Sequence, residues 1–297
     1  MARADTLVLL GEGRRVADFM ALTKPRVVTM VLVTTFVGFY LASAGTPDWL
    51  RLLHTLVGTA LAAGGTLALN QYLERDLDAR MRRTRMRPLP DGRLAPAEAL
   101  VFGTAITATG LAYLALAVDV ASSAVTLAIV ALYLGAYTPL KPVTPFATVI
   151  GAVPGALPPV TGWVAAGGGL AAGAAVLFGI LFLWQVPHTL AIARLYREDY
   201  ARAGILVLPV VDAEGAATER QIALGCLALL AVGCLPTLVG LAGPVYFFGA
   251  LLLGAGFLAC GLAQALAPSD ASARRVLLAS VLYLPLLLGL MALDRLG

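Results

Sequence analysis

The residues with the clearest chemical potential recur every four positions at the end of an apolar run. Asn70, Glu74 and Asp78 stand at i, i+4 and i+8. If one helix runs through them, successive members differ by about 40° and line one face over roughly 12 Å of its axis. Carboxylate and amide oxygens suit a hard cation such as Mg²⁺, whose coordination substrate phosphates typically complete. The spacing therefore predicts a metal-assisted phosphate site, with a solvated helix end paired to neighbouring arginines as the alternative.

Directly after this face, the segment 80–87 holds five arginines in eight residues. A guanidinium group binds phosphate in a bidentate manner and stays charged. Beside a carboxylate face, this composition predicts a diphosphate whose charge is shared between metal and arginines. The alternative is a topology anchor or a site for anionic lipid.

A second polar cluster follows a later apolar run. Glu198 has Arg194 four residues before it and Arg202 four residues after it, so we expect a helical ladder to neutralise Glu198. Asp199 has no arginine at either spacing and is the better candidate for a metal ligand.

Two single residues could contact a substrate. His188 follows Pro187 inside an apolar run, where a histidine can ligate iron, relay a proton or hydrogen-bond a neighbour. Lys141 stands in a proline-rich turn and could bind phosphate as a point charge, or serve as a topology anchor.

The elements that must position these residues are membrane helices. The chain has 297 residues, 60% of them hydrophobic and 13% charged, whereas roughly 25% are charged in soluble domains. This composition excludes a soluble globular protein and a disordered one. We predict an all-α polytopic protein with nine spans around a central cavity, at about 25–45, 52–73, 96–116, 119–138, 145–166, 171–190, 218–239, 243–266 and 273–293. A tail, 1–24, precedes a single nine-helix domain, 25–297.

Basic residues fall almost entirely on one side of this parse. Of the 21 Lys and Arg residues, 19 lie on the side of the N-terminus and only Arg51 and Arg295 on the other. The positive-inside rule then predicts a cytoplasmic N-terminus, an external C-terminus and polar clusters that face the cytoplasm. The basic charge is explained by topology, so no nucleic-acid partner is expected. Arginine outnumbers lysine and no transit peptide is evident, which favours a bacterial plasma membrane.

Four strings and the Asn70-x-x-x-Glu74-x-x-x-Asp78 spacing carry a family resemblance. The spacing resembles the NxxxDxxxD signature of the UbiA-type intramembrane prenyltransferases. The strings resemble the branch of that family that farnesylates heme, and the resemblance covers nearly the whole chain. They are LTKPR (22–26), DLDARMRRTRMRPL (76–89), YTPLK (137–141) and WQVPH (184–188).

The resemblance implies a chemistry and a set of partners. It implies nine helices around a cavity that opens sideways to lipid, with Mg²⁺ and farnesyl diphosphate at the cytoplasmic side. Heme B is then a substrate, heme O the product, and heme A synthase an expected downstream partner. Allylic cation chemistry would use aromatic faces, for which Tyr40, Tyr133, Tyr137, Phe146 and Trp163 are candidates.

Carried over to this sequence, the resemblance also implies roles for single residues. Metal and catalytic roles fall on Asn70, Glu74, Asp78 and Asp199. Substrate contacts fall on Arg75, Arg82, Arg85, Lys141 and His188.

Two departures and two alternatives accompany these expectations. Position 74 is usually Asp in the family, and the longer Glu74 changes the carboxylate geometry. The second motif has fewer aligned acids than in related prenyltransferases, which weakens the metal role of Asp199. An aromatic or quinone-precursor acceptor would use the same diphosphate chemistry as heme. A transporter is the other alternative, disfavoured because the acids cluster at one side.

Overall fold

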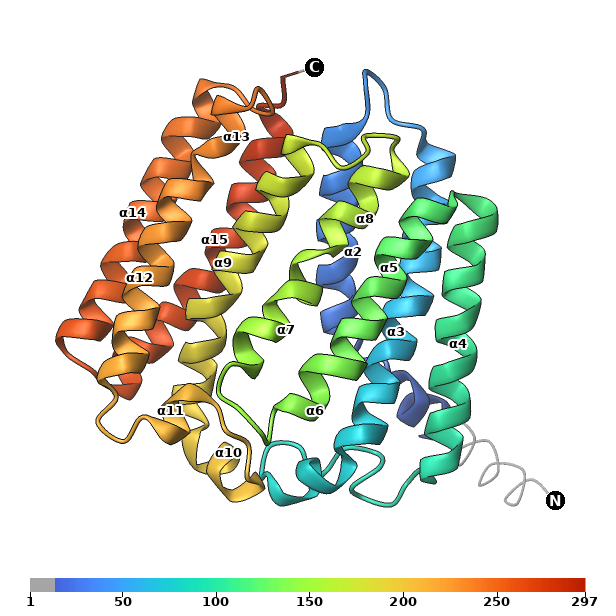
Figure 1. Cartoon of the computed structure of the whole chain (residues 1–297), viewed down its shortest axis with the longest axis vertical. Helices are drawn as coiled ribbons and strands as arrows, with labels where there is room; N and C mark the ends of the chain where they lie inside the picture. Colours follow the sequence, from blue (N-terminus) through green and yellow to red (C-terminus); the bar gives the residue numbers. More distant parts are fainter. Residues whose placement is uncertain (1–13, 297) are drawn as a thin grey trace, which may run out of the picture.

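A computed structural model describes residues 14–296, and within them the chain is helical, with one isolated bridge between Ala242 and Arg295. Residues 14–22 are helical and precede the long helices (Figure 1). The elements are α2 (Pro25–Ala42), α3 (Trp49–Arg80), α4 (Pro96–Ala117), α5 (Val120–Leu132), the π-helical η1 (Tyr133–Tyr137), α6 (Thr138–Leu140), α7 (Ala147–Ala156), α8 (Pro158–Ala165), α9 (Ala172–Leu195), α10 (Arg197–Ala203), α11 (Leu208–Val211), α12 (Ala216–Gly233), α13 (Leu235–Leu238), α14 (Pro244–Leu266) and α15 (Asp270–Leu293).

Nine of the helical stretches in the described residues are long and apolar enough to cross a bilayer. Three of these stretches join shorter elements: α5 with η1 and α6, α7 with α8, and α12 with α13. The prediction of nine spans is confirmed, and the chain is a multi-pass membrane protein. The largest difference is in α3, which continues to Arg80 rather than ending near 73. The first polar cluster therefore lies on a continuous helix. The predicted division into a tail and one domain falls partly outside the described residues and stays a prediction.

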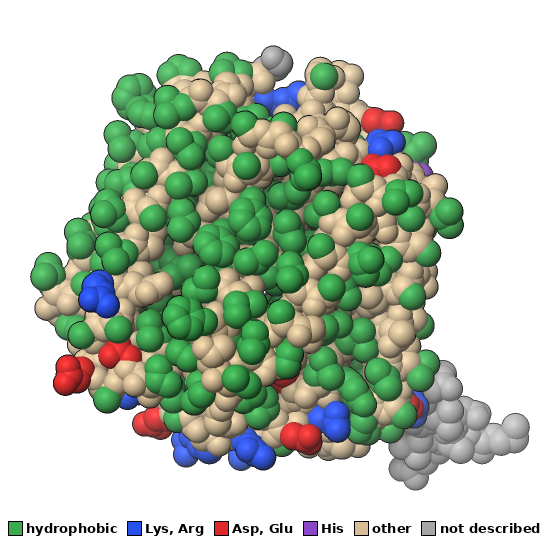
Figure 2. Space-filling view, in the orientation of Figure 1, with side chains coloured by type: hydrophobic (Ala, Val, Ile, Leu, Met, Phe, Trp, Pro, Cys, Tyr) green, Lys and Arg blue, Asp and Glu red, His purple; other side chains and the backbone are tan. Residues whose placement is uncertain are grey.

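The surface of the molecule consists of an apolar belt and two polar ends. Hydrophobic side chains cover the visible face between the ends, and most charged side chains gather at its lower end (Figure 2). That end, which we call the basic end, holds α10, α11 and the loop 81–95 (Figure 1). The opposite end holds α13 and the loop between α2 and α3. A bilayer would cover the apolar belt and leave both ends in water.

The helices pack in two groups, which contact each other through α8 and α9 and through α2 and α15. One group joins α3 to α4 and α2 to α8, and the other joins α9 to α12 and α15 and α14 to both of these (Figure 1). Helix α7 contacts both α5 and α9 and so bridges the groups. Ligand sites in helical proteins form between facing helices, and this is where the cavity described below lies.

A pair of glycines brings α2 and α8 into backbone contact. A Cβ at Gly38 would lie 2.0 Å from the carbonyl oxygen of Pro159, and one at Gly162 would lie 1.9 Å from that of Thr35. Only glycine fits at such separations, and small residues are the usual means of close helix contact in membranes. This contact holds the C-terminal half of α2 against α8. The N-terminal half, which begins at Pro25, is less buried.

A wide turn interrupts the fourth span near the basic end. The amide of Thr138 donates to the carbonyl of Tyr133, five residues earlier, and Pro139 follows. Such single π-turns are frequent at functional sites. Here the turn places the rings of Tyr133 and Tyr137 5.1 Å apart.

Candidate active site at the basic end

Helix α3 carries three polar residues on one buried face. Asn70, Glu74 and Asp78 are 1%, 6% and 0% exposed. The side chain of Asp76, on the other side of the helix, is 80% exposed. The helical period predicted from the sequence therefore separates the site acids from the surface acid.

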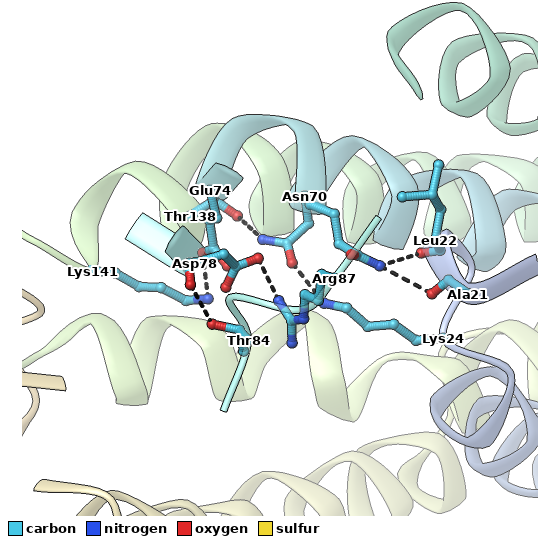
Figure 3. A network of polar contacts seen from close by, with 11 residues as sticks. Ala21, Leu22, Lys24, Asn70, Glu74, Asp78, Thr84, Arg87, Thr138 and Lys141 are labelled. Atoms are coloured by element: carbon cyan, nitrogen blue, oxygen red, sulfur yellow. Dashed lines mark hydrogen bonds and ion pairs between the residues drawn. The ribbon is translucent and has the colours of Figure 1, made fainter. Parts of the chain in front are cut away.

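Each buried acid meets a cation from another segment of the chain. Lys141 Nζ lies 2.5 Å from Glu74 Oε1, and Arg87 Nη1 lies 2.6 Å from Asp78 Oδ2 (Figure 3). Thr84 donates its hydroxyl to the backbone carbonyl of Asp78 at 2.9 Å, which holds the loop against the helix. Buried charges need such partners because burial without one is costly. The loop 81–95 and the turn after α6 thus converge on α3.

Asn70 connects the acids to two further segments. Its Oδ1 accepts from Lys24 Nζ at 3.0 Å, and its Nδ2 donates to Thr138 Oγ1 at 3.1 Å. Lys24 has a φ of 49°, a left-handed conformation that costs a non-glycine residue free energy. The residue before Pro25 is held in this conformation with its ammonium group in the site.

The two lysines differ in their electrostatic environment. Burial, together with the nearby charge of Arg87, lowers the pKa of Lys24 to about 7. Burial also opposes charge on Lys141, but Tyr137 and Glu74 outweigh it and raise the pKa of Lys141. The ammonium of Lys141 lies 4.4 Å from the centroid of the Tyr137 ring. The surroundings of Lys141 therefore favour its charged form, whereas those of Lys24 oppose it.

The donor set on α3 fits a hard divalent cation. Asp78 Oδ1 is buried and has no hydrogen-bond partner among the described residues. No group of three or more His, Cys, Asp and Glu side chains in residues 14–296 is close enough to hold a metal ion by itself. A metal here would draw on Glu74, Asp78 and the amide oxygen of Asn70, with phosphate oxygens of a substrate completing its shell.

Asp199 lies apart from these acids and has its own partners. It is 8% exposed and accepts hydrogen bonds from the backbone amides of Arg82 and Arg83, both at 3.3 Å. Arg202 Nη1 lies 3.0 Å from its Oδ1. Asp199 has no arginine four residues away, as the sequence indicates, but Arg202 reaches it from three residues away. Asp199 anchors the start of the loop 81–95.

The predicted ladder around Glu198 is wrong. Arg194 Nη1 lies 2.7 Å from Glu219 Oε1, while Arg202 is engaged by Asp199. Helix α9 ends at Leu195, and a break at Tyr196 precedes α10. The break interrupts the helical spacing between Arg194 and Glu198, whereas Arg202, in the same short helix as Glu198, pairs with Asp199 instead.

The arginines of the basic segment are distributed unevenly. Arg87 reaches the buried acids, whereas the side chains of Arg82 and Arg85 are exposed on the same loop. Arg75 donates to the carbonyl of Tyr72 and lies over its ring. Lys24 and Arg87 are the site residues that the sequence argument did not single out, although both fall inside the strings that carry the resemblance.

An apolar cavity of about 450 Å³ adjoins this cluster. Tyr133 and Tyr137 line it, so the ring beneath Lys141 is part of the cavity wall. Val27 and Met30 also line it and are 46% and 39% exposed, so the cavity opens on the apolar surface beside α2. Of the other aromatic candidates, Tyr40, Phe146 and Trp163 do not line the cavity. Its lining also includes Arg26, Trp184, Gln185 and His188.

The chain belongs to the UbiA prenyltransferase family, whose sequence pattern matches residues 31–286. It is 48% identical over 289 residues to the protoheme IX farnesyltransferase of Solibacter usitatus, covering 94% of this chain and 99% of that one. It is 44% identical to the protoheme IX farnesyltransferase of Koribacter versatilis, covering 96% and 95%. The family predicted from the sequence is confirmed, and the transporter alternative has no support.

Solved structures share the fold at low sequence identity. A structure of digeranylgeranylglyceryl phosphate synthase superposes with a TM-score of 0.79 at 15% identity, covering 95% of this chain and 98% of that chain. A UbiA homolog from Archaeoglobus fulgidus bound to GPP and Mg²⁺ has a TM-score of 0.65 at 16% identity, covering 92% and 99%. The predicted all-α architecture around a central cavity is therefore confirmed.

Proposed function

We propose that this enzyme transfers the farnesyl group of farnesyl diphosphate to a vinyl group of heme B, with addition of water, to give heme O and diphosphate. The observation that carries the proposal is that the buried, cation-paired acids of α3 lie next to an aromatic-walled cavity: Lys141, which pairs with Glu74, lies over the ring of Tyr137 in the cavity wall. The acids and their cations suit a diphosphate. The aromatic-walled cavity suits a prenyl chain with a planar acceptor. The identity of the acceptor is supported by the relatives named protoheme IX farnesyltransferase.

The metal in this proposal is Mg²⁺. Asn70, Glu74 and Asp78 would hold it, and Asp199 would position the loop above it or supply a further oxygen. Bound Mg²⁺ supplies charge stabilisation to the leaving diphosphate. The chain departs from the usual Asp at position 74, and Lys141 already holds the longer Glu74 in place.

Cationic side chains would share the charge of the diphosphate with the metal. Lys141 and Arg87 are within reach, because their present partners are the same acids that would turn to the metal. Arg82 and Arg85 are exposed on the same loop and are candidates to bind the outer phosphate oxygens. Arg75 is a candidate to contact the substrate as it approaches. Fixed charges at the leaving group stabilise the transition state without reorganisation at the moment of reaction.

Farnesyl transfer would take place inside the cavity, beside the diphosphate site. The bond between the farnesyl C1 and the diphosphate oxygen breaks, and the electron pair leaves with the diphosphate. The heme vinyl group attacks the allylic cation, a water oxygen then bonds to the resulting cationic carbon, and a proton is released. Tyr133, Tyr137 and Trp184 present ring faces that would stabilise positive charge, and the apolar walls exclude stray water.

The acceptor would sit against α9, where His188 is the candidate ligand for the heme iron. Arg26, at the start of α2, also lines the cavity and is available to a heme propionate.

We also propose the bacterial cytoplasmic membrane as the location, with the basic end in the cytoplasm. The 19 basic residues on that side support this orientation. Heme O would then pass to a downstream oxidising enzyme, for which heme A synthase is the expected partner.

The test is to incubate purified protein with heme B, farnesyl diphosphate and Mg²⁺, with and without EDTA, and to weigh the extracted hemes. The expected product carries one farnesyl group and one hydroxyl more than heme B and is absent with EDTA. Consumption of farnesyl diphosphate without a heme product would overturn the acceptor in favour of an aromatic or quinone precursor. No reaction in folded protein would overturn the whole proposal.

A further inference from the structure

A buried serine on α15 contacts both aromatic side chains that α9 presents to the cavity. Ser280 is 0% exposed and does not line the cavity itself. Its Oγ lies 2.8 Å from His188 Nδ1, and its backbone carbonyl accepts from Trp184 Nε1 at 2.8 Å. The rings of Trp184 and His188 stack with centroids 4.6 Å apart and planes 19° apart. One residue thus holds the orientation of both rings.

The hydrogen bonds around Ser280 favour one of the two neutral tautomers of His188. The Ser280 hydroxyl donates its single hydrogen to the carbonyl of Leu277, at 2.6 Å. With the hydroxyl hydrogen on that carbonyl, the Ser280 oxygen accepts from His188, and this arrangement places the hydrogen of the neutral imidazole on Nδ1. In the neutral imidazole, the lone pair is then on Nε2.

The same contact sets the direction in which that lone pair points. Nδ1 is turned to α15, while the ring of His188 lines the cavity. Nε2 is consequently the nitrogen available to a molecule in the cavity. Among residues 14–296, no acid forms an ion pair with His188. An apolar site without a counter-ion favours the neutral ring.

We propose that Ser280 is a positioning residue that presents Nε2 of His188 as an axial ligand to the iron of the porphyrin acceptor. The proposal rests on the proposed function, since it needs an iron porphyrin in the cavity. Histidines that bind metals through one nitrogen regularly donate from the other to a fixed acceptor, which sets their tautomer and direction. Ser280 fills that place here, from a helix that is distant in sequence from the two aromatic residues.

The experiment compares iron protoporphyrin IX with metal-free protoporphyrin IX on the full chain in micelles. Ser280→Val removes the hydroxyl. Ser280→Thr keeps the hydroxyl in a side chain of nearly the same volume as Val. Ser123→Ala is the matched control, because Ser123 also donates to a helix carbonyl, that of Leu111, and neither residue lines the cavity. Binding is measured by absorbance and fluorescence titration, and ligation by the electron paramagnetic resonance spectrum of the ferric porphyrin.

We expect Ser280→Val to weaken binding of the iron porphyrin about tenfold and to lose the histidine-ligated spectrum. Ser280→Thr and Ser123→Ala keep both, and metal-free protoporphyrin binds all variants equally. His188→Gly loses the spectrum, and added imidazole restores it. An unchanged spectrum in His188→Gly would overturn the proposal, as would equal loss of both porphyrins in Ser280→Val, which would indicate a collapsed cavity.

A parallel assay of the wild-type protein separates this proposal from the proposed function. If farnesylated heme forms while the spectrum of His188→Gly is unchanged, only the inference about Ser280 and His188 fails. If the wild-type protein binds no iron porphyrin and forms no farnesylated heme, both fail together.

Discussion

The ion pairs at the two ends of the helix bundle differ in how deeply they are buried. At the opposite end, Arg51 pairs with Asp119 at 2.7 Å, and the side chains are 37% and 26% exposed. At the basic end, the side chains of Glu74 and Asp78 are only 8% and 1% exposed in their pairs with Lys141 and Arg87. Exposed pairs contribute little to stability, whereas a buried pair is costly to break.

The two ends also differ in what their polar groups leave free. Arg51 donates to the carbonyl of Ala165 as well as to Asp119, and Arg295 donates to the carbonyl of Ser43 and lies over the ring of Tyr40. These contacts tie helix ends together. At the basic end, Asp78 Oδ1 has no partner within the described chain. A buried network with a free acceptor beside a cavity indicates ligand binding, and an exposed, satisfied network indicates structural support.

Metal removal should have the largest effect on farnesyl transfer and tests whether the basic end alone binds the metal. EDTA should reduce farnesyl transfer to background, and excess Mg²⁺ should restore it, because within residues 14–296 only the basic end offers buried carboxylates to the metal. Product is measured by mass analysis of extracted porphyrins. Asp119→Asn serves as the control and should need the same Mg²⁺ concentration as the wild-type protein. Full activity in EDTA would remove the metal from the proposed site.

Substitution of one acid at each end should separate the ends most sharply. Asp78→Asn should lower turnover at least about 100-fold, because the charge that would face the metal is lost. Asp119→Asn should leave turnover unchanged, since Asn also caps helix N-termini and Asp119 caps α5. Rates are compared at equal amounts of folded protein, judged by size-exclusion chromatography. Near-normal turnover in Asp78→Asn would contradict the site assignment.

Removal of one cation at each end should show the difference in stability. Lys141→Met leaves the buried Glu74 carboxylate unpaired and should lower the free energy of unfolding by about 3 kcal/mol. Arg51→Met should cost about 1 kcal/mol, because that pair is more exposed. Denaturant titration in micelles measures both. The double variant Glu74→Gln, Lys141→Met should recover most of the loss, and no recovery would refute the ion pair as its cause.

The smallest effect concerns an acid of the basic end that lies outside the site. Asp212 Oδ2 accepts from the amide and hydroxyl of Thr218, at 2.7 and 2.8 Å. Desolvation raises the pKa of Asp212, but these hydrogen bonds outweigh it and the net pKa is lowered. Its stabilisation is therefore present above the unfolded pKa of about 4 and is lost as pH falls through the lowered value.

For this reason, Asp212→Asn should reduce the unfolding midpoint slightly at pH 7, and the difference from the wild-type protein should shrink as pH falls below about 4. Turnover should not change. Loss of turnover would show that charge at the basic end matters in general, rather than the buried cluster in particular. Thermal unfolding monitored by circular dichroism over a pH series gives the comparison.

The sequence predicts local features of this protein well. Hydropathy over about 20 residues defines each span, and the structure differs mainly at helix ends such as Arg80. The helical period places Asn70, Glu74 and Asp78 together, because four-residue spacing acts within one continuous helix. It fails at Glu198, because the helix breaks at Tyr196 between Arg194 and Glu198, and because Arg202 pairs with Asp199.

By itself, the sequence determined the nine spans, the family, the acidic face of α3 and the excess of basic residues on one side. Hydropathy, helical period and charge distribution are properties of short segments, so they can be read without a fold. Only the tertiary structure decided that Arg87 pairs with Asp78, that Lys24 binds Asn70, and that Ser280 holds the ring of His188. These contacts join residues that are far apart in sequence or separated by a turn. Their formation depends on how the helices pack and where the chain bends.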